Sequence, residues 1–228
     1  ICLIMSSIND ESGSGNGEVF EQFVEAVSHS ALGSLLPPSL CQFLVGLRGG
    51  CSMYWAKTGD DVVLTNQGRT ARQTKSSRSV LANVALKQNT GAYSWRIRVD
   101  NITRSGCKYI GVVNQEGVQT ANLNKNLQSG CSGKRIAWDG SCARIYHDID
   151  DYAYGSTSIG KKYATGDIVT VQVDTDQKIV SFQLNDEAIE QCYQYKGAYE
   201  LVPVIGFGYE TDTEQYTLLD CSWWGKQI

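Results

Sequence analysis

The chain has 228 residues, a formal charge of −4 at pH 7 and a pI near 5.2. This length is enough to bury a substantial core in one large domain. The acidic balance argues against a nucleic-acid partner, which needs clustered Lys and Arg, so we interpret the basic stretch RTARQTKSSR at 69–78 as an exposed strand and loop. No apolar run reaches the ~18 residues of a membrane span, so we expect no membrane contact.

The cysteines favour free thiols in a reducing compartment. No CxxC pair occurs, both histidines lie far from any cysteine pair, and a chain of this length does not need disulfides to fold. The ligand spacing of a zinc site is also absent, and we expect no cofactor. We therefore expect a cytoplasmic or nuclear protein. Because the chain starts at Ile1 instead of Met, we expect it to be part of a longer polypeptide or complex.

Two segments precede the main domain. Residues 1–17 include SSINDESGSGNG, whose polar, Gly- and Ser-rich composition predicts a flexible leader. Residues 18–50 carry apolar side chains at helical spacing, which predict a helix that Pro37-Pro38 breaks and a shorter second helix. We interpret 18–50 as a helical preface to a main domain at 51–228.

After residue 50 the sequence changes to short strands separated by turns. Alternating apolar and polar residues predict strands at Asp61–Thr65, Arg69–Gln73, Leu81–Leu86, Ala92–Asp100, Lys108–Val113, Arg135–Trp138, Ala143–His147, Asp167–Val173, Lys178–Leu184, Leu201–Gly208 and Tyr216–Cys221. Many short strands without intervening helices predict an all-β fold, and two facing antiparallel sheets suit this number of strands best.

The stretch GDIVTVQVDTDQKIVSFQLNDE at 166–187 predicts a hairpin. Its first strand alternates Val with polar residues, and its second places Lys178, Val180, Phe182 and Leu184 on one face. The polar residues DTDQ at 174–177 supply the turn. Alternation along the strands also assigns four aromatic residues to the core: Trp95, Trp138, Phe182 and Phe207.

Five motifs, in this order, resemble those of the SPRY (B30.2-type) domain family. They are GAYSWRIRVD at 91–100, KYIGVV at 108–113, AWDGSCARIYHD at 137–148, the hairpin at 166–187 and ELVPVIGFG at 200–208. Two positions depart from the family pattern: Arg96 stands where the family usually has Glu, and Asp186 replaces the usual Gly after the hairpin. Asp tolerates a left-handed backbone, so we expect the turn to form in a divergent member.

The resemblance implies a bent sandwich of two antiparallel sheets, whose loops form a binding face for a protein partner. It places Tyr209, after Pro203, where some relatives use an aromatic residue to contact a peptide. The same loop carries Glu210 and Asp212. An amphipathic ring beside a loop can anchor a partner at low entropy cost. We therefore expect this loop to contact the partner.

Two further loops supply candidate contacts. Tyr152 and Tyr154 lie in a segment without strand periodicity and share the rationale given for Tyr209. The connection at 114–133 is rich in Asn and Gln, which adapt readily as hydrogen-bond donors and acceptors, and it contributes Asn124 and Asn126. A solvated connection without a binding role explains this loop equally well.

Taken with the resemblance, these residues predict a protein–protein interaction module without catalytic activity. It would serve substrate recognition or scaffolding in a larger assembly, such as a ubiquitin ligase. No GxSxG motif occurs, and a solvated strand end explains His147-Asp148 and Asp150-Asp151 better than a catalytic dyad or cation site. The alternative is a carbohydrate-binding, lectin-like domain, which would place an exposed aromatic residue beside Asp and Asn, often with calcium.

Overall fold

The computed structural model describes residues 53–75, 78–102, 107–115, 123–124, 134–150, 155–188, 192–208 and 214–224. The chain divides into two compact units, 1–52 and 53–228, and all described residues belong to the second. The predicted leader at 1–17 and the predicted helical preface at 18–50 lie outside the described residues. Within the described part of the chain, no helix is long and apolar enough to cross a membrane.

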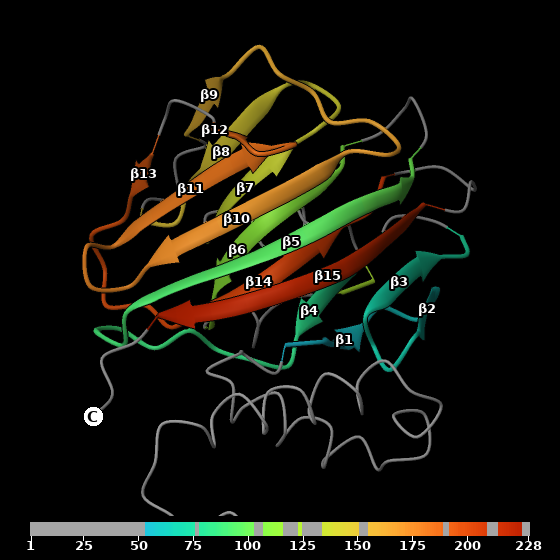
Figure 1. Cartoon of the computed structure of the whole chain (residues 1–228), viewed down its shortest axis with the longest axis horizontal. Helices are drawn as coiled ribbons and strands as arrows, with labels where there is room; N and C mark the ends of the chain where they lie inside the picture. Colours follow the sequence, from blue (N-terminus) through green and yellow to red (C-terminus); the bar gives the residue numbers. More distant parts are fainter. Residues whose placement is uncertain are drawn as a thin grey trace, which may run out of the picture. The chain divides into compact units, whose positions relative to one another are not determined.

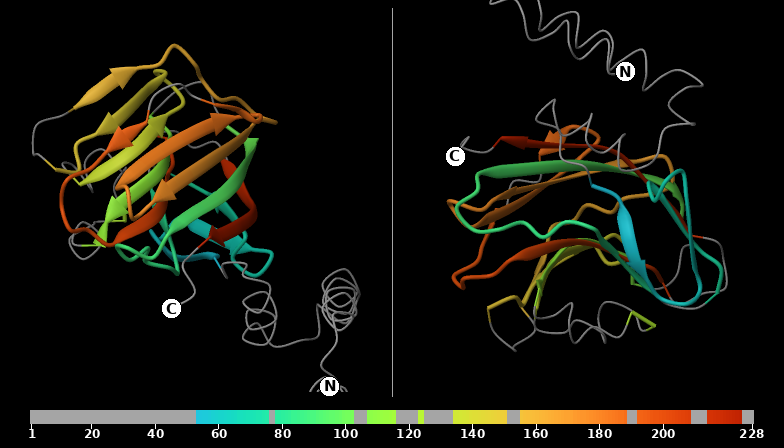
Figure 2. Two further views of the ribbon diagram at one scale, coloured as in Figure 1. Left: turned by 60° about the vertical axis from the view of Figure 1, so that its left-hand side comes forward. Right: turned by 90° about the horizontal axis from the view of Figure 1, so that it is seen from below.

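The described residues form two antiparallel sheets that face each other (Figures 1 and 2). Sheet A has, in spatial order, β1 (Trp55–Thr58), β4 (Ser79–Ala82), β14 (Leu201–Gly206), β6 (Tyr109–Asn114), β7 (Arg135–Asp139), β8 (Arg144–His147) and β9 (Ser156–Ser158). Sheet B has β12 (Glu187–Ala188), β11 (Ile179–Leu184), β10 (Ile168–Asp174), β5 (Ala92–Asn101), β15 (Gln215–Trp224), β3 (Thr70–Gln73) and β2 (Val62–Thr65), and β13 (Tyr193–Gln194) pairs with β11. The predicted all-β sandwich is confirmed.

The main core lies between the two sheets. Successive residues of a strand point to opposite faces, so Trp95 and Ile97 of β5 are buried while Arg98 is exposed on the outer face. The four predicted core aromatics are each at most 1% exposed: Trp95, Trp138, Phe182 and Phe207. Trp138 of sheet A packs edge-on against Phe182 of sheet B, with ring centroids 6.2 Å apart. The sheets therefore contact each other through these aromatic residues.

The outer face of sheet A carries a second apolar cluster. It consists of Leu81, Tyr109, Val113, Ala137, Val202 and Val204, and Leu123 from the connection between β6 and β7 packs against it. Arg135 is fully buried beside this cluster, with its guanidinium carbon 4.6 Å from the ring centroid of Tyr146. Its charge is paired with Asp148, whose Oδ2 lies 3.4 Å from Arg135 Nη2. This face is thus packed by a loop and is not a bare solvated surface.

The turn between β11 and β12 confirms the expectation for Asp186. Asn185 and Asp186 have φ angles of 50° and 68°, in the left-handed region that Asn and Asp tolerate better than other non-glycine residues. The Asn185 side chain also fixes this turn. Its Oδ1 accepts a hydrogen bond from Ile168 N (2.8 Å), and its Nδ2 donates to Asp167 Oδ1 (2.8 Å).

Some strand predictions need correction. The strand predicted at Leu81–Leu86 is instead β4, Ser79–Ala82, and Leu86 makes an isolated bridge to Leu201. The prediction that Lys178 shares a strand face with Val180 is wrong, because the hairpin turn extends to Lys178, whose φ is 59°. The short strands β1, β9, β12 and β13 were not predicted, since their few residues show too little alternation.

Candidate functional site

One end of the sandwich gathers several connections between strands. In sheet A, Gly206 of β14 lies opposite both Ser79 of β4 and Tyr109 of β6. The connection that follows β14 therefore starts beside the one that precedes β4, and Phe207 N donates a hydrogen bond to Arg78 O (2.8 Å). The turn at 59–61 lies here as well, because Gly59 N donates to Ser79 O (3.2 Å). We call this region the Gly208 end.

A buried ion pair fixes the base of the connection between β14 and β15. Lys108 Nζ lies 3.5 Å from Glu214 Oε1, and both side chains are at most 2% exposed. Glu214 Oε2 also accepts a hydrogen bond from Gly208 N (2.8 Å). Gln73 holds both ends of the connection, since its N donates to Glu214 O (2.9 Å) and its Nε2 donates to Gly208 O (3.1 Å). The two described residues that flank 209–213, Gly208 and Glu214, are thus held together.

Two buried tyrosines lie near this ion pair. Tyr163 Oη donates a hydrogen bond to Lys108 O (2.8 Å). Burial, followed by the charges of Asp139 and Glu214, raises the pKa of Tyr163 well above its usual value. Burial, followed by its neighbours Tyr163 and Glu214, does the same to the pKa of Tyr216. Both phenols therefore stay protonated at neutral pH, and Tyr163 uses its hydroxyl to hold the backbone of Lys108.

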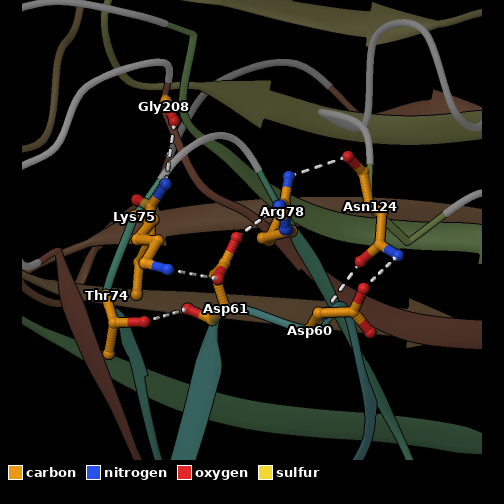
Figure 3. Close-up of polar contacts among 8 residues, drawn as sticks. Asp60, Asp61, Thr74, Lys75, Arg78, Asn124 and Gly208 are labelled. Atoms are coloured by element: carbon orange, nitrogen blue, oxygen red, sulfur yellow. Dashed lines mark hydrogen bonds and ion pairs between the residues drawn. The ribbon is translucent and has the colours of Figure 1, made fainter.

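Charged residues join the other segments of the Gly208 end (Figure 3). The Arg78 guanidinium contacts the Asp61 carboxylate through Nη2, and its Nη1 donates to Asn124 O (2.8 Å). Asp61 O in turn accepts hydrogen bonds from Thr74 N (2.8 Å) and Thr74 Oγ1 (3.0 Å). The half-buried Asp61–Arg78 pair therefore ties the turn at 59–61 to the segment at 74–78 and to the connection between β6 and β7.

Asn124 holds the β6–β7 connection against the turn at 59–61. Its Oδ1 accepts a hydrogen bond from Asp60 N (2.8 Å), and its Nδ2 donates to Asp60 Oδ2 (2.8 Å). Gly59 permits this close approach, because a Cβ there would lie 2.4 Å from Leu123 O and 2.9 Å from Asn124 Oδ1. The backbone of this end is therefore set by contacts between segments that are distant in sequence.

Of the candidate contact residues, the structure describes Asn124 alone. Asn124 is exposed at the Gly208 end, with its amide engaged by Asp60. The loop with Tyr209, Glu210 and Asp212 starts and ends at the same place, at Gly208 and Glu214. These three residues lie outside the described residues, as do Asn126, Tyr152 and Tyr154.

The loop that contains Tyr152 and Tyr154 belongs to the opposite end of sheet A. It starts after β8 and returns at Gly155, whose O accepts a hydrogen bond from His147 N (2.9 Å). His147 lies opposite Ile136 near the start of β7, whereas Asp139 at the end of β7 lies opposite Tyr109 at the Gly208 end. The strands that flank the two loops end at opposite ends of sheet A. This arrangement does not support a single flat partner surface that contacts both loops.

Of the residues weighed as a catalytic or cation site, His147, Asp148 and Asp150 have structural partners, and Asp151 lies outside the described residues. His147 Nε2 lies 3.0 Å from Thr157 Oγ1, and its ring stacks on Tyr193. Asp148 is paired with Arg135, and Asp150 Oδ1 accepts hydrogen bonds from the backbone N of Lys196 and of Gly197, each at 3.0 Å. Among the described residues, no group of three His, Cys, Asp or Glu side chains could hold a metal ion.

The sequence reasoning missed the residues that hold the Gly208 end together: Gln73, Arg78, Lys108 and Glu214. Lys108 is the first residue of the expected KYIGVV strand, and Glu214 closes the acidic stretch ETDTE at 210–214, so neither residue indicates a buried ion pair by itself. No local pattern pairs two residues that are about a hundred positions apart. The available signal is that two separate strands, β6 and β15, each begin beside a charged residue, and that these two charges are opposite in sign.

The comparisons with known proteins agree with this architecture. A family model described as the SPRY domain matches residues 92–219, from β5 into β15. The SPRY domain of human HERC1 aligns with a TM-score of 0.56 at 17% identity, covering 73% of this chain and 97% of that one. A further human SPRY domain gives 0.51 at 13%, covering 72% and 96%, and the PSpry domain of TRIM65 gives 0.54 at 10%, covering 73% and 90%.

At these identities the solved structures share the fold alone. No curated protein sequence matches the chain at a significant level. The family model describes the SPRY domain as a whole, without the B30.2 subtype, and its match spans more than half of the chain. The strands β5, β6, β7–β8, β10–β11 and β14 also carry the five motifs that resembled the family, in the same order. The chain belongs to the SPRY domain family.

Proposed function

We propose that this chain captures a peptide segment or a folded surface of another protein through the loops of the Gly208 end, without turning it over. SPRY domains are protein-interaction modules, and membership of that family supports the general role. The observation that carries the choice of surface is the buried base of the 209–213 loop, made by Lys108, Glu214 and Gln73. Loops recognise partners best when a rigid scaffold presents them, because less ordering entropy is lost on binding.

Each candidate residue has a distinct part in this proposal. Tyr209 supplies the aromatic anchor, directly after the fixed Gly208. Glu210 and Asp212 supply a polar rim around it, and the exposed Asn124 borders the same surface from the β6–β7 connection. Asn126 follows in that connection. Aromatic anchors within a polar rim are the usual composition of an energetic hot spot.

The proposal extends to the setting of the domain. We propose a recognition or scaffold part of a larger assembly, such as a ubiquitin ligase, in the cytoplasm or nucleus. Among the described residues, Cys107, Cys142 and Cys192 are free cysteines, which fits a reducing compartment. The formal charge of −4 gives no support to a nucleic-acid partner.

The test is capture of the partner from the native source with the full chain as bait, followed by affinity measurement with the purified partner. Tyr209→Ala should weaken binding by ~1–3 kcal/mol, or roughly 5- to 150-fold, because it removes the anchor ring. Tyr152→Ala is the matched control, since it removes the same ring from the loop at the opposite end. Equal affinity of Tyr209→Ala and the parent chain would remove this loop from the site, and a loss confined to Tyr152→Ala would move the site to that end.

The carbohydrate-binding alternative makes a different prediction. A lectin of this layout often depends on calcium, so a chelator would abolish binding to the captured partner or to glycans. The protein-interaction proposal predicts that affinity stays within about twofold when a chelator is added, since no step in it uses a metal. Isothermal titration calorimetry with and without chelator separates the two.

A further inference from the structure

Strand β9 is the outermost strand of sheet A, where it pairs with β8 on one side (Figure 1). Its ladder is regular, with Ser156 opposite Tyr146, Thr157 opposite Ile145 and Ser158 opposite Arg144. His147 N donates to Gly155 O (2.9 Å) and Ile159 N donates to Ala143 O (2.9 Å). Because bonding alternates along an antiparallel strand, the backbone N–H and C=O groups of Ser156 and Ser158 point away from β8.

These outward groups are accessible. Ser156 and Ser158 are both exposed, and within the described residues no strand pairs with β9 on its outer side. Natural sheets often blunt an edge with a bulge or a lysine on the strand. The opposite edge of sheet A has both devices, since β1 contains Lys57 and a register shift between Trp55 and Lys57. Strand β9 has neither, and nothing among the described residues blocks its outer side from pairing with another chain.

Positive charge surrounds the end of this edge. Arg144 is exposed directly across the ladder from Ser158, and Lys161 and Lys162 are exposed just after the strand. Lys161 Nζ lies 3.2 Å from Glu187 Oε2, in a pair that is exposed to solvent. Arg144 and Lys162 have no ion pair within the described part of the chain. The local charge is therefore positive, although the chain as a whole is negative.

We propose that the β9 edge binds an extended acidic segment of a partner protein, which adds a strand to sheet A. Backbone bonds to Ser156 and Ser158 hold the segment, and Arg144, Lys161 and Lys162 select acidic side chains along it. The short, hydroxyl-bearing strand leaves room for a neighbouring strand at the usual spacing of 4.7–4.9 Å. This surface is separate from the loops of the Gly208 end, so either proposal can fail without the other.

Nuclear magnetic resonance on the labelled full chain tests the pairing directly. The probe is the synthetic peptide acetyl-Thr-Glu-Val-Glu-Val-Thr-amide, and the control probe has Lys in place of each Glu. We expect the acidic peptide to shift the amide signals of Ser156 and Ser158 and to slow their hydrogen exchange, and the basic peptide to leave them unchanged. Absence of binding at millimolar concentration, or shifts confined to other residues, would overturn the proposal.

Two variants separate backbone pairing from charge selection. Ser158→Pro removes the outward N–H without touching the bonds to β8, and edge strands tolerate such a proline. It should weaken binding of the acidic peptide by roughly 3- to 10-fold. The double variant Arg144→Glu/Lys162→Glu should weaken it by at least about 10-fold and needs no change of backbone.

Lys57→Glu is the control for position, because it reverses one positive charge at the opposite edge of sheet A, as each half of the double variant does at the β9 edge. It should keep the affinity of the parent chain within about twofold. If Lys57→Glu weakens binding as much as the double variant, the effect is one of net charge and the proposed site is wrong. If Ser158→Pro folds, as its spectrum will show, and binds like the parent, the added-strand geometry is wrong.

Discussion

At the scale of single residues, the departures from the family pattern have local compensation. Arg96, which stands where the family usually has Glu, contacts Asp220 of the neighbouring strand β15 through both Nε and Nη2. This bond and the Asp220 charge raise the pKa of Arg96 above its usual value. Relative to the family pattern, the charge at this position has changed sign, and Asp220 on the neighbouring strand supplies the opposite charge. The outer face of sheet B therefore keeps a paired polar surface.

Removal of the buried Trp95 ring should destabilise the fold more than removal of the exposed Trp223 ring. Trp95→Ala should lower the free energy of unfolding by ~3–5 kcal/mol, because it leaves a cavity between the sheets where the ring is 1% exposed. Trp223 is the matched control, since its ring is 39% exposed and stacks on Tyr93 at the surface. Trp223→Ala should cost about 1 kcal/mol. Urea unfolding of the three chains checks this, and equal midpoints would show that the faces of β5 are reversed.

Asp100 should make stability depend on pH. Partial burial alone raises the pKa of Asp100, but hydrogen bonds from Thr217, Arg98 and Gln215 outweigh it and leave the pKa below its usual value. A lowered pKa in the folded state stabilises the fold above the pKa of the unfolded chain, and this contribution is lost as pH falls through the folded value. Asp100→Asn should therefore cost about 1 kcal/mol at pH 7, and its difference from the parent should shrink below about pH 4.

Thermal unfolding of Asp100→Asn and the parent between pH 7 and pH 3 measures this difference. Glu187→Gln, which alters an exposed pair with Lys161, is the control and should change stability by less than about 0.5 kcal/mol at every pH. A constant difference between Asp100→Asn and the parent across this range would show that the carboxylate is not held by these hydrogen bonds.

At the scale of elements, alternation in the sequence was enough for the long strands. The motifs in β5, β10 and β11 have enough residues for a period of two to be visible, and their predicted inward residues Trp95, Val171 and Phe182 are buried. The three residues of β9 and the pairs in β12 and β13 are too short to show a period. They become strands because the neighbouring strands β8 and β11 offer backbone partners, which is tertiary information.

The proposed contact residues were chosen from local information of the same kind, and their role stays a prediction. Tyr209, Glu210 and Asp212 were chosen from their place after a strand, which needs no knowledge of distant residues. The base beneath them could not be found in this way, because Lys108 and Glu214 meet only after β6 and β15 have joined different sheets. The opposite placement of the loop with Tyr152 also depends on the strand order.

Removal of one charge of the buried Lys108–Glu214 pair should lower the stability of the domain strongly. Glu214→Ala should lower the free energy of unfolding by ~3–5 kcal/mol, because it leaves the ammonium of Lys108 buried without its partner. The double variant Lys108→Met/Glu214→Leu should cost less than Glu214→Ala, since no unpaired charge stays buried. Chemical denaturation measures both. A double variant that is less stable than Glu214→Ala would show that the pair contributes more than neutralisation of its own charges.

At the scale of the whole molecule, the described unit is an antiparallel sandwich with two different ends, and β9 is one of its outermost strands. The Gly208 end brings together segments near positions 60, 73, 78, 124 and 208 through Asp61, Arg78, Asn124 and Gln73. The opposite end carries the loop between β8 and β9, and the edge at β9 leaves backbone groups unpaired in the described residues. We propose that the partner binds at the first of these surfaces, the Gly208 end.

Hydrogen–deuterium exchange of the full chain, with and without the captured partner, tests that claim most directly. We expect slower exchange at 206–215, with smaller effects at 59–62 and 123–126, because these segments border the same surface. Hydrogen–deuterium exchange in the outer strands of sheet B should be the same with and without the partner. Slower exchange confined to 148–156 or to the outer face of sheet B, with 206–215 unaffected, would contradict the account.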